Sequence, residues 1–141
     1  MSIQYASKSY SKSEILSLLH PRVARWYSRF EPTPPQAMAI PLIHNGENVL
    51  ITSPTGTGKT LAAFMTVISE LASMEDNGSL DDRVYALYVS PLRALNNDIR
   101  RNLLVPLEEI GLNFRVAVRT GDTPSSERQR MLRKPPHILI T

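Results

Sequence analysis

Two periodicities of hydrophobic residues alternate along this chain. Runs of consecutive apolar and β-branched residues predict strands, and apolar residues at spacings of three and four predict helices. The predicted strands are residues 49–52, 84–90, 114–119 and 137–140, and the predicted helices between them are residues 61–72, 95–109 and 125–132. Strands that alternate with helices at these lengths are typical of an α/β fold, with a parallel sheet and flanking helices.

The N-terminal third predicts helices only. Ser11 or Ser13 can cap a helix that Pro21 interrupts, so two short helices are expected there. A proline-rich extended stretch follows and leads into another helix at about residues 35–44. Gly46 tolerates a positive φ and is expected to end that helix.

Composition narrows the class of protein. The 141 residues are 42% hydrophobic and 21% charged, which is ordinary for a soluble globular domain. No cysteine is present, which excludes a disulfide framework or a thiolate site, and three scattered histidines argue against a dedicated metal centre. The N-terminus lacks the apolar stretch of a secretion signal, and no apolar run approaches the ~20 residues of a membrane span. We therefore expect a cytoplasmic protein without a membrane partner.

The net charge of +3 is unevenly distributed. Residues 1–92 hold seven Lys or Arg against eight Asp or Glu, whereas residues 93–141 hold nine against five. A basic C-terminal half is compatible with a polyanionic partner. The basic residues of 128–134 can equally form a solubilising surface, because no aromatic residue lies among them to stack on bases.

One segment between a predicted strand and a predicted helix has the pattern of a phosphate-binding loop. It consists of Ser53, Pro54, Thr55, Gly56, Thr57, Gly58, Lys59 and Thr60. Glycines let backbone N–H groups turn towards phosphate oxygens, and the helix N-terminus adds partial positive charge. Lys59 is expected to reach the outer phosphates, and the Thr60 hydroxyl is expected to hold Mg²⁺.

Two further turns are expected at the same edge of the sheet as this loop. Ser90 ends the second predicted strand and Pro91 follows it, and Thr120, Gly121 and Asp122 follow the third. In open parallel α/β sheets, ligands bind at the carboxyl ends of the strands. The three turns together predict a binding face.

These segments resemble the first RecA-like domain of superfamily 2 nucleic-acid helicases, close to the DEAD-box proteins and most of all to the large helicase-related (Lhr) type. The stretch from Thr33 to Gln36 resembles the Q motif, and residues 53–60 match motif I, which in this family begins with Ala or Ser. Residues 91–95 match motif Ia, and residues 120–123 resemble a glycine-containing turn that touches the same nucleic-acid strand.

The resemblance implies a role for each matching residue. Gln36 is expected to read the adenine edge of ATP, with Thr33 supporting the loop, although Gln36 could also simply cap its helix. Pro91 and Arg93 are expected to contact the nucleic-acid backbone, as are the three residues of the glycine turn; Arg93 could instead be an ordinary arginine at a helix start. ATP and Mg²⁺ are the implied cofactors, and single-stranded or duplex nucleic acid is the implied partner.

The resemblance also implies a domain organisation. Residues 1–30 are expected to form a helical extension, and residues 31–141 part of the first RecA-like domain, ending before the strand of the acidic box. That box and a second motor domain supply hydrolytic residues in the family, so we expect the chain alone to bind nucleotide without catalysing its hydrolysis. A sheet missing its later strands is expected to leave an open edge, through which the chain could self-associate.

Two other classes of function stay open from the sequence. A P-loop enzyme that acts on a small molecule would need the phosphate loop but neither Gln36 nor residues 91–95. A nucleotide-binding regulatory module would need no motor partner. Nucleic-acid binding that depends on salt separates the helicase from the first alternative.

Overall fold

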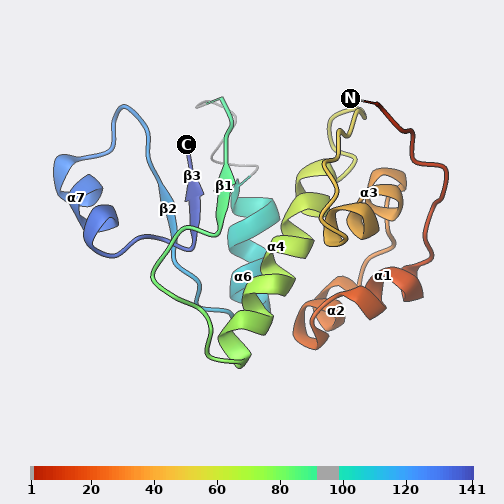
Figure 1. Ribbon diagram of the computed structural model, residues 1–141, viewed down its shortest axis with the longest axis horizontal. Helices are drawn as coiled ribbons and strands as arrows, with labels where there is room; N and C mark the ends of the chain where they lie inside the picture. Colours follow the sequence, from red (N-terminus) through yellow and green to blue (C-terminus); the bar gives the residue numbers. More distant parts are fainter. Residues whose placement is uncertain (1, 92–98) are drawn as a thin grey trace. The chain divides into compact units, whose positions relative to one another are not determined.

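The computed structural model describes residues 2–91 and 99–141. The chain divides into two compact units, Met1–Ser73 and Met74–Thr141. The first unit is helical, and the second contains the sheet (Figure 1). The predicted boundary after residue 30 stays a prediction.

Three short helices precede the phosphate loop: α1 (Lys12–Leu18), α2 (Pro21–Tyr27) and α3 (Pro34–His44). Ser11 caps α1, its Oγ accepting from the N–H of Glu14 at 3.2 Å. Pro21 is the first residue of α2, a position where its missing N–H costs nothing. The predicted interruption between two N-terminal helices is confirmed.

The core of the N-terminal unit forms where these helices meet α4 (Lys59–Asp76). α1 packs against both α2 and α3. Residues with no exposed surface come from all four helices: Ile15, Val23, Tyr27, Ile40, Met65 and Ile68. A hydrogen bond of 2.6 Å from the N–H of His20 to Ser69 Oγ joins the start of α2 to α4.

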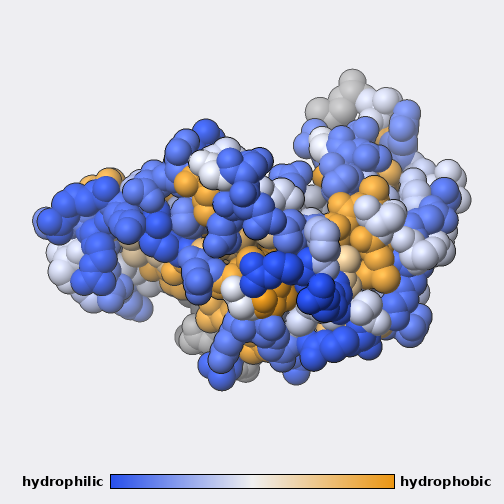
Figure 2. Space-filling model, turned by 90° about the horizontal axis from the view of Figure 1, so that it is seen from below, coloured by the Kyte–Doolittle hydropathy of each residue, from blue (hydrophilic) through white to orange (hydrophobic). Residues whose placement is uncertain are grey.

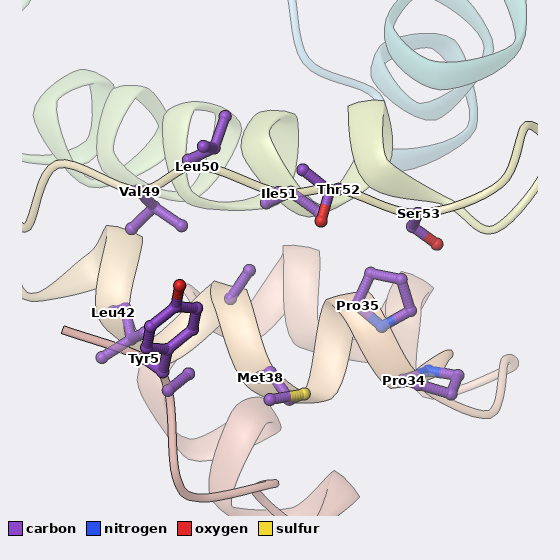
Figure 3. Close-up of a pocket in the computed structure, with 12 residues that line it drawn as sticks. Tyr5, Pro34, Pro35, Met38, Leu42, Val49, Leu50, Ile51, Thr52 and Ser53 are labelled. Atoms are coloured by element: carbon purple, nitrogen blue, oxygen red, sulfur yellow. The ribbon is translucent and has the colours of Figure 1, made fainter. Parts of the chain in front are cut away.

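The segment before the phosphate loop differs from the prediction. Residues 49–52 were expected to form a buried strand, but they pair with no strand among the described residues, and Leu50 is 90% exposed. The segment passes alongside α3 over an apolar pocket of about 350 Å³, which Tyr5, Met38 and Leu42 also line (Figure 3). The prediction was based on the β-branched, apolar residues of this segment. A strand also needs a neighbouring strand as partner for its backbone hydrogen bonds, and composition does not show whether one is present.

The C-terminal unit contains a three-stranded parallel sheet of β1 (Ala86–Tyr88), β3 (Ile138–Ile140) and β2 (Val116–Val118), in that order. Leu139 lies opposite both Leu87 and Ala117 in the register. The predicted parallel arrangement is confirmed, with shorter strands. One face of the sheet is buried at Ile138 and Ile140, but Leu87 is 61% exposed. Because residues 84–89 are almost all apolar, the sequence predicts a strand covered on both faces, and the exposure of Leu87 shows that this prediction is wrong.

The helix that follows β1 in sequence is irregular where the structure describes it. A π-helical turn, η2 (Arg100–Leu104), leads into α6 (Val105–Ile110), and the N–H of Val105 bonds to the carbonyl of Arg100. Pro106 has no N–H to donate, so the regular pattern cannot run through this position. The sequence predicts that Gly111 ends this helix, and Gly111 does so with φ of 82°.

The last helix, α7 (Ser125–Arg133), has no buried residue. Its hydrophilic surface lies at the left end of Figure 2. The sequence predicts Ser125 or Ser126 as the N-cap of this helix, but Pro124 occupies the N-cap position, so that prediction is wrong. Among the residues that the structure describes, no helix has the length and apolar character needed to cross a membrane.

His137, at the start of β3, couples the stability of the sheet to pH. The residue is 5% exposed, and its Nδ1 accepts from the N–H of Arg115 at 3.0 Å. Burial, and secondly the charge of Arg115, lower the pKa of His137 below 6.5. When the pH falls below the pKa of His137 in the unfolded chain, the unfolded chain binds a proton there while His137 of the folded chain stays neutral. The free energy of unfolding therefore decreases as the pH falls.

We predict that the melting temperature decreases between pH 7 and pH 5, and that His137→Asn flattens this decrease. The asparagine carbonyl can accept from the N–H of Arg115 but does not titrate. Each pH unit between the unfolded and folded pKa values contributes up to about 1.4 kcal/mol. Thermal denaturation of both proteins across this range tests the prediction. Parallel pH profiles for the wild type and the variant would contradict it.

Candidate functional site

The predicted phosphate loop has a backbone that only glycine adopts readily at two positions. The φ angles are +84° at Gly56 and +81° at Gly58, both in the left-handed region. Helix α4 begins directly after them, at Lys59. The predicted order of loop and then helix is confirmed, although no strand precedes the loop among the residues that the structure describes.

Side chains within the loop hold it in a tight turn. The Thr57 hydroxyl donates to the carbonyl of Pro54 at 2.7 Å, so Ser53 must donate to Thr57 in the 2.6 Å contact between their hydroxyls. Lys59 Nζ donates to the carbonyl of Ser53 at 2.5 Å. This charge-assisted hydrogen bond links the beginning of the loop to the start of α4.

Two residues at the start of α3 hold the loop from outside. The Thr33 hydroxyl donates to the carbonyl of Thr57 at 2.6 Å. Gln36 is only 4% exposed; its Nε2 donates to the carbonyl of Gly58 at 3.2 Å, and its Oε1 accepts from the N–H of Thr33 at 3.2 Å. Gln36 therefore caps its own helix and contacts the loop as well.

Gly58 is required for this contact as well as for its backbone angle. A Cβ placed on Gly58 would lie 2.2 Å from Gln36 Nε2, which no real packing allows, whereas a Cβ on Gly56 would meet nothing within 4 Å. The two glycines thus serve different purposes. Gly56 permits the turn, and Gly58 permits both the turn and the approach of Gln36.

The residues present fit a nucleotide triphosphate with its metal ion. Positive φ at two glycines, a lysine at the loop and an 18-residue helix starting there suit an anion. Thr60 follows Lys59 and carries the hydroxyl type that Mg²⁺ accepts beside a phosphate. When bound, Mg²⁺ neutralises charge on the phosphates.

The second group of predicted site residues belongs to the C-terminal unit. Pro91 follows β1, and Thr120, Gly121 and Asp122 follow β2, so both turns lie at the carboxyl edge of this sheet. The sequence predicted that these two turns lie at the same edge of the sheet. Arg93 lies outside the described residues, and the structure describes no relation of these turns to the phosphate loop.

Arg128 of α7 organises the glycine turn. Its guanidinium donates to three carbonyls, those of Thr123 at 3.0 Å, Thr120 at 3.2 Å and Gly121 at 3.0 Å. The Thr123 hydroxyl also accepts from the N–H of Thr120 at 2.8 Å. The turn is therefore fixed by a side chain that the sequence suggested only as part of a basic surface.

Sequence reasoning missed one residue beside the loop. Tyr27 has no exposed surface, and its hydroxyl donates to Gln36 Oε1 at 2.6 Å. The sequence predicts an aromatic cluster of Trp26, Tyr27 and Phe30 that packs in the core; Tyr27 is buried and contacts Phe30, but Phe30 is 42% exposed. No pattern in the sequence indicated that its hydroxyl would reach Gln36.

These features define an α/β domain of the RecA-like type, the type found in solved helicase structures. The family model for DEAD/DEAH box helicases matches residues 33–141, and the chain belongs to this family.

Within that family, the chain is similar to the Lhr-type helicases. It is 55% identical to the ATP-dependent helicase Lhr-Core of Methanocaldococcus jannaschii over 99% of this chain, and 55% identical to that of Saccharolobus solfataricus over 94%. A solved structure of the Mycobacterium smegmatis helicase Lhr bound to ssDNA and AMP-PNP matches 90% of this chain and 17% of its own, with 41% identity and a TM-score of 0.75. The chain spans only 18% and 16% of the two Lhr-Core proteins.

Proposed function

We propose that this chain is the part of an ATP-dependent nucleic-acid helicase that binds MgATP. The observation that carries the proposal is the phosphate loop held from outside by Gln36 and Thr33. A generic phosphate loop needs no glutamine against its last glycine. Membership of the DEAD/DEAH box helicase family and the ATP-dependent relatives support the same function.

Each residue of the loop has a role in this proposal. Backbone N–H groups from Gly56 onwards surround the phosphate oxygens, and Lys59 exchanges the carbonyl of Ser53 for the outer phosphates. Thr60 holds Mg²⁺ through its hydroxyl. Gln36, with Thr33 behind it, lies where a purine base can be read.

We also propose that nucleic acid binds along the carboxyl edge of the sheet in the C-terminal unit. Thr120 is partly exposed and Gly121 and Asp122 are exposed there, and Pro91 follows the neighbouring strand. Arg119 is exposed next to the turn, and the exposed arginines of α7 follow it. Backbone N–H groups and arginines are the usual partners of phosphates. In its solved structure, the Lhr relative is bound to ssDNA.

We predict that Lys59→Ala weakens MgATP binding about 10- to 100-fold, because a charge-assisted contact to a charged group contributes about 1.5–3 kcal/mol. Lys8→Ala is the matched control, since Lys8 is an exposed lysine of the same unit, with its ion pair to Glu14. Isothermal titration calorimetry of the wild type and both variants tests this. Equal affinities in the two variants would rule out the proposed nucleotide site.

For nucleic acid, we predict that Arg128→Met weakens binding of single-stranded DNA more than Arg130→Met does. Each variant removes one charge from α7, but only Arg128 holds the three carbonyls of the glycine turn. If the lost charge contacts a phosphate, the slope of log affinity against log salt concentration becomes shallower by roughly 0.7. The loss of the turn is expected to add a roughly threefold to tenfold decrease, from about 1 kcal/mol of lost hydrogen bonding.

Fluorescence anisotropy at several salt concentrations measures both effects. Hydrogen exchange of the amides of residues 120–123 provides an independent measurement, and exchange there should accelerate in Arg128→Met only. If the two variants bind DNA equally while exchange differs, the turn is not part of the nucleic-acid surface.

A further inference from the structure

The Gln36 amide has a fixed orientation, which its neighbours determine. The N–H of Thr33 can only donate, and the carbonyl of Gly58 can only accept. The Gln36 oxygen must therefore face Thr33, and its nitrogen must face Gly58, as the 3.2 Å distances show. Since Oε1 only accepts, the Tyr27 hydroxyl must be the donor in their 2.6 Å hydrogen bond.

This arrangement uses most of the hydrogen-bonding capacity of Gln36. Oε1 has two lone pairs, and Thr33 and Tyr27 occupy both. Nε2 has two hydrogens, one of which goes to Gly58. One N–H is left to donate to a base, and no lone pair is left to accept from one.

Adenine needs more than a donor if it is to be read along its major-groove edge. That edge presents N7, an acceptor, beside the 6-amino group, a donor. The remaining N–H of Gln36 can donate to N7 of adenine. The 6-amino group is a donor, so it needs a lone pair of Gln36 Oε1 to accept its hydrogen bond. One of the two present donors must therefore leave.

Tyr27 is the donor that can leave. The N–H of Thr33 belongs to the backbone at the start of α3, whose position is also fixed by the Thr33 hydroxyl on Thr57. The Tyr27 hydroxyl needs only to rotate about its C–O bond. Burial raises the pKa of Tyr27 to about 12, so the hydroxyl keeps its proton at neutral pH and stays a donor.

We propose that Tyr27 is a specificity-determining residue of the nucleotide site, because its hydroxyl competes with the 6-amino group of adenine for the oxygen of Gln36. The inference rests on the proposed function, in which the loop binds ATP and Gln36 reads the base. Tyr27 has no exposed surface, so its displaced hydroxyl finds no water. The hydrogen bond gained by adenine is therefore offset by the one that Tyr27 loses.

The test compares ATP with purine riboside triphosphate, which lacks the 6-amino group, in the wild type and in Tyr27→Phe. We expect the affinity ratio of ATP to purine riboside triphosphate to lie within roughly threefold of one in the wild type. In Tyr27→Phe this ratio should increase by about threefold to tenfold, the usual effect of one hydrogen bond. The affinity for purine riboside triphosphate itself should change little.

Two further variants make the comparison specific. Tyr85→Phe removes another hydrogen-bonded hydroxyl, one that accepts from the N–H of Asp81 at 3.0 Å in the other unit, and should leave the ratio unchanged. Gln36→Met removes the amide, so adding Tyr27→Phe to it should have no effect on the ratio. Thermal denaturation checks that each variant is folded.

The outcomes separate this inference from the function on which it rests. If both nucleotides bind through Lys59 and the ratio is unchanged or lower in Tyr27→Phe, Tyr27 does not compete with adenine and the inference fails alone. If Tyr27→Phe raises the ratio even without the Gln36 amide, the inference also fails. If neither nucleotide binds to the folded wild type, the proposed function fails and the inference with it. A wild-type ratio above about 30 overturns the inference without any variant, since it exceeds one hydrogen bond.

Discussion

The side-chain amide of Gln36 is the interaction on which the nucleotide site depends. Its nitrogen bonds to the carbonyl of Gly58, and its oxygen bonds to the start of α3 and to Tyr27 of α2. Three parts of the chain, α2, the start of α3 and the phosphate loop, therefore meet at one buried group. Unpaired groups of a buried amide cost free energy, so the three hydrogen bonds that Gln36 makes restrict where each of these parts can lie. The glycine at position 58 follows from the same constraint, since any side chain there would displace Gln36.

In the C-terminal unit, too, a side chain from a helix hydrogen-bonds to the backbone of a loop, but here the side chain is an arginine instead of an amide. Arg128 converts a short turn of polar residues into a fixed shape by bonding to three of its carbonyls. In both units a side chain from a helix holds a loop that is proposed to meet phosphates. The loops supply backbone groups for the ligand, and the helices supply the side chains that keep those groups in place.

The sequence predicted the parts of the structure that depend on local pattern. Alternation of strands and helices gave the parallel sheet, Pro21 separated two helices, and Gly111 ended a third. Predictions that required knowledge of neighbours were less successful. Residues 49–52 have strand-like composition but no paired strand in the described chain, and Leu87 belongs to an apolar strand yet is largely exposed. Tyr27 was assigned to the core, correctly, but the direction of its hydroxyl depends on how α2 packs against α3. Gln36 and Thr33 were located by family resemblance, and their contacts with Gly58 and Thr57 could be known only from the fold.

The contact between Gln36 and Gly58 is the most direct point at which to test this account. Gly56 and Gly58 have almost equal positive φ angles, so Gly56→Ala and Gly58→Ala carry the same backbone strain of about 1–2 kcal/mol. Only Gly58→Ala also forces Gln36 out of its place. The measurement is the free energy of unfolding in urea for both variants, in the wild type and in Gln36→Ala. The account predicts that Gly58→Ala costs about 1–3 kcal/mol more than Gly56→Ala, and that Gln36→Ala removes most of this difference. Equal costs for the two glycines in both backgrounds would contradict it.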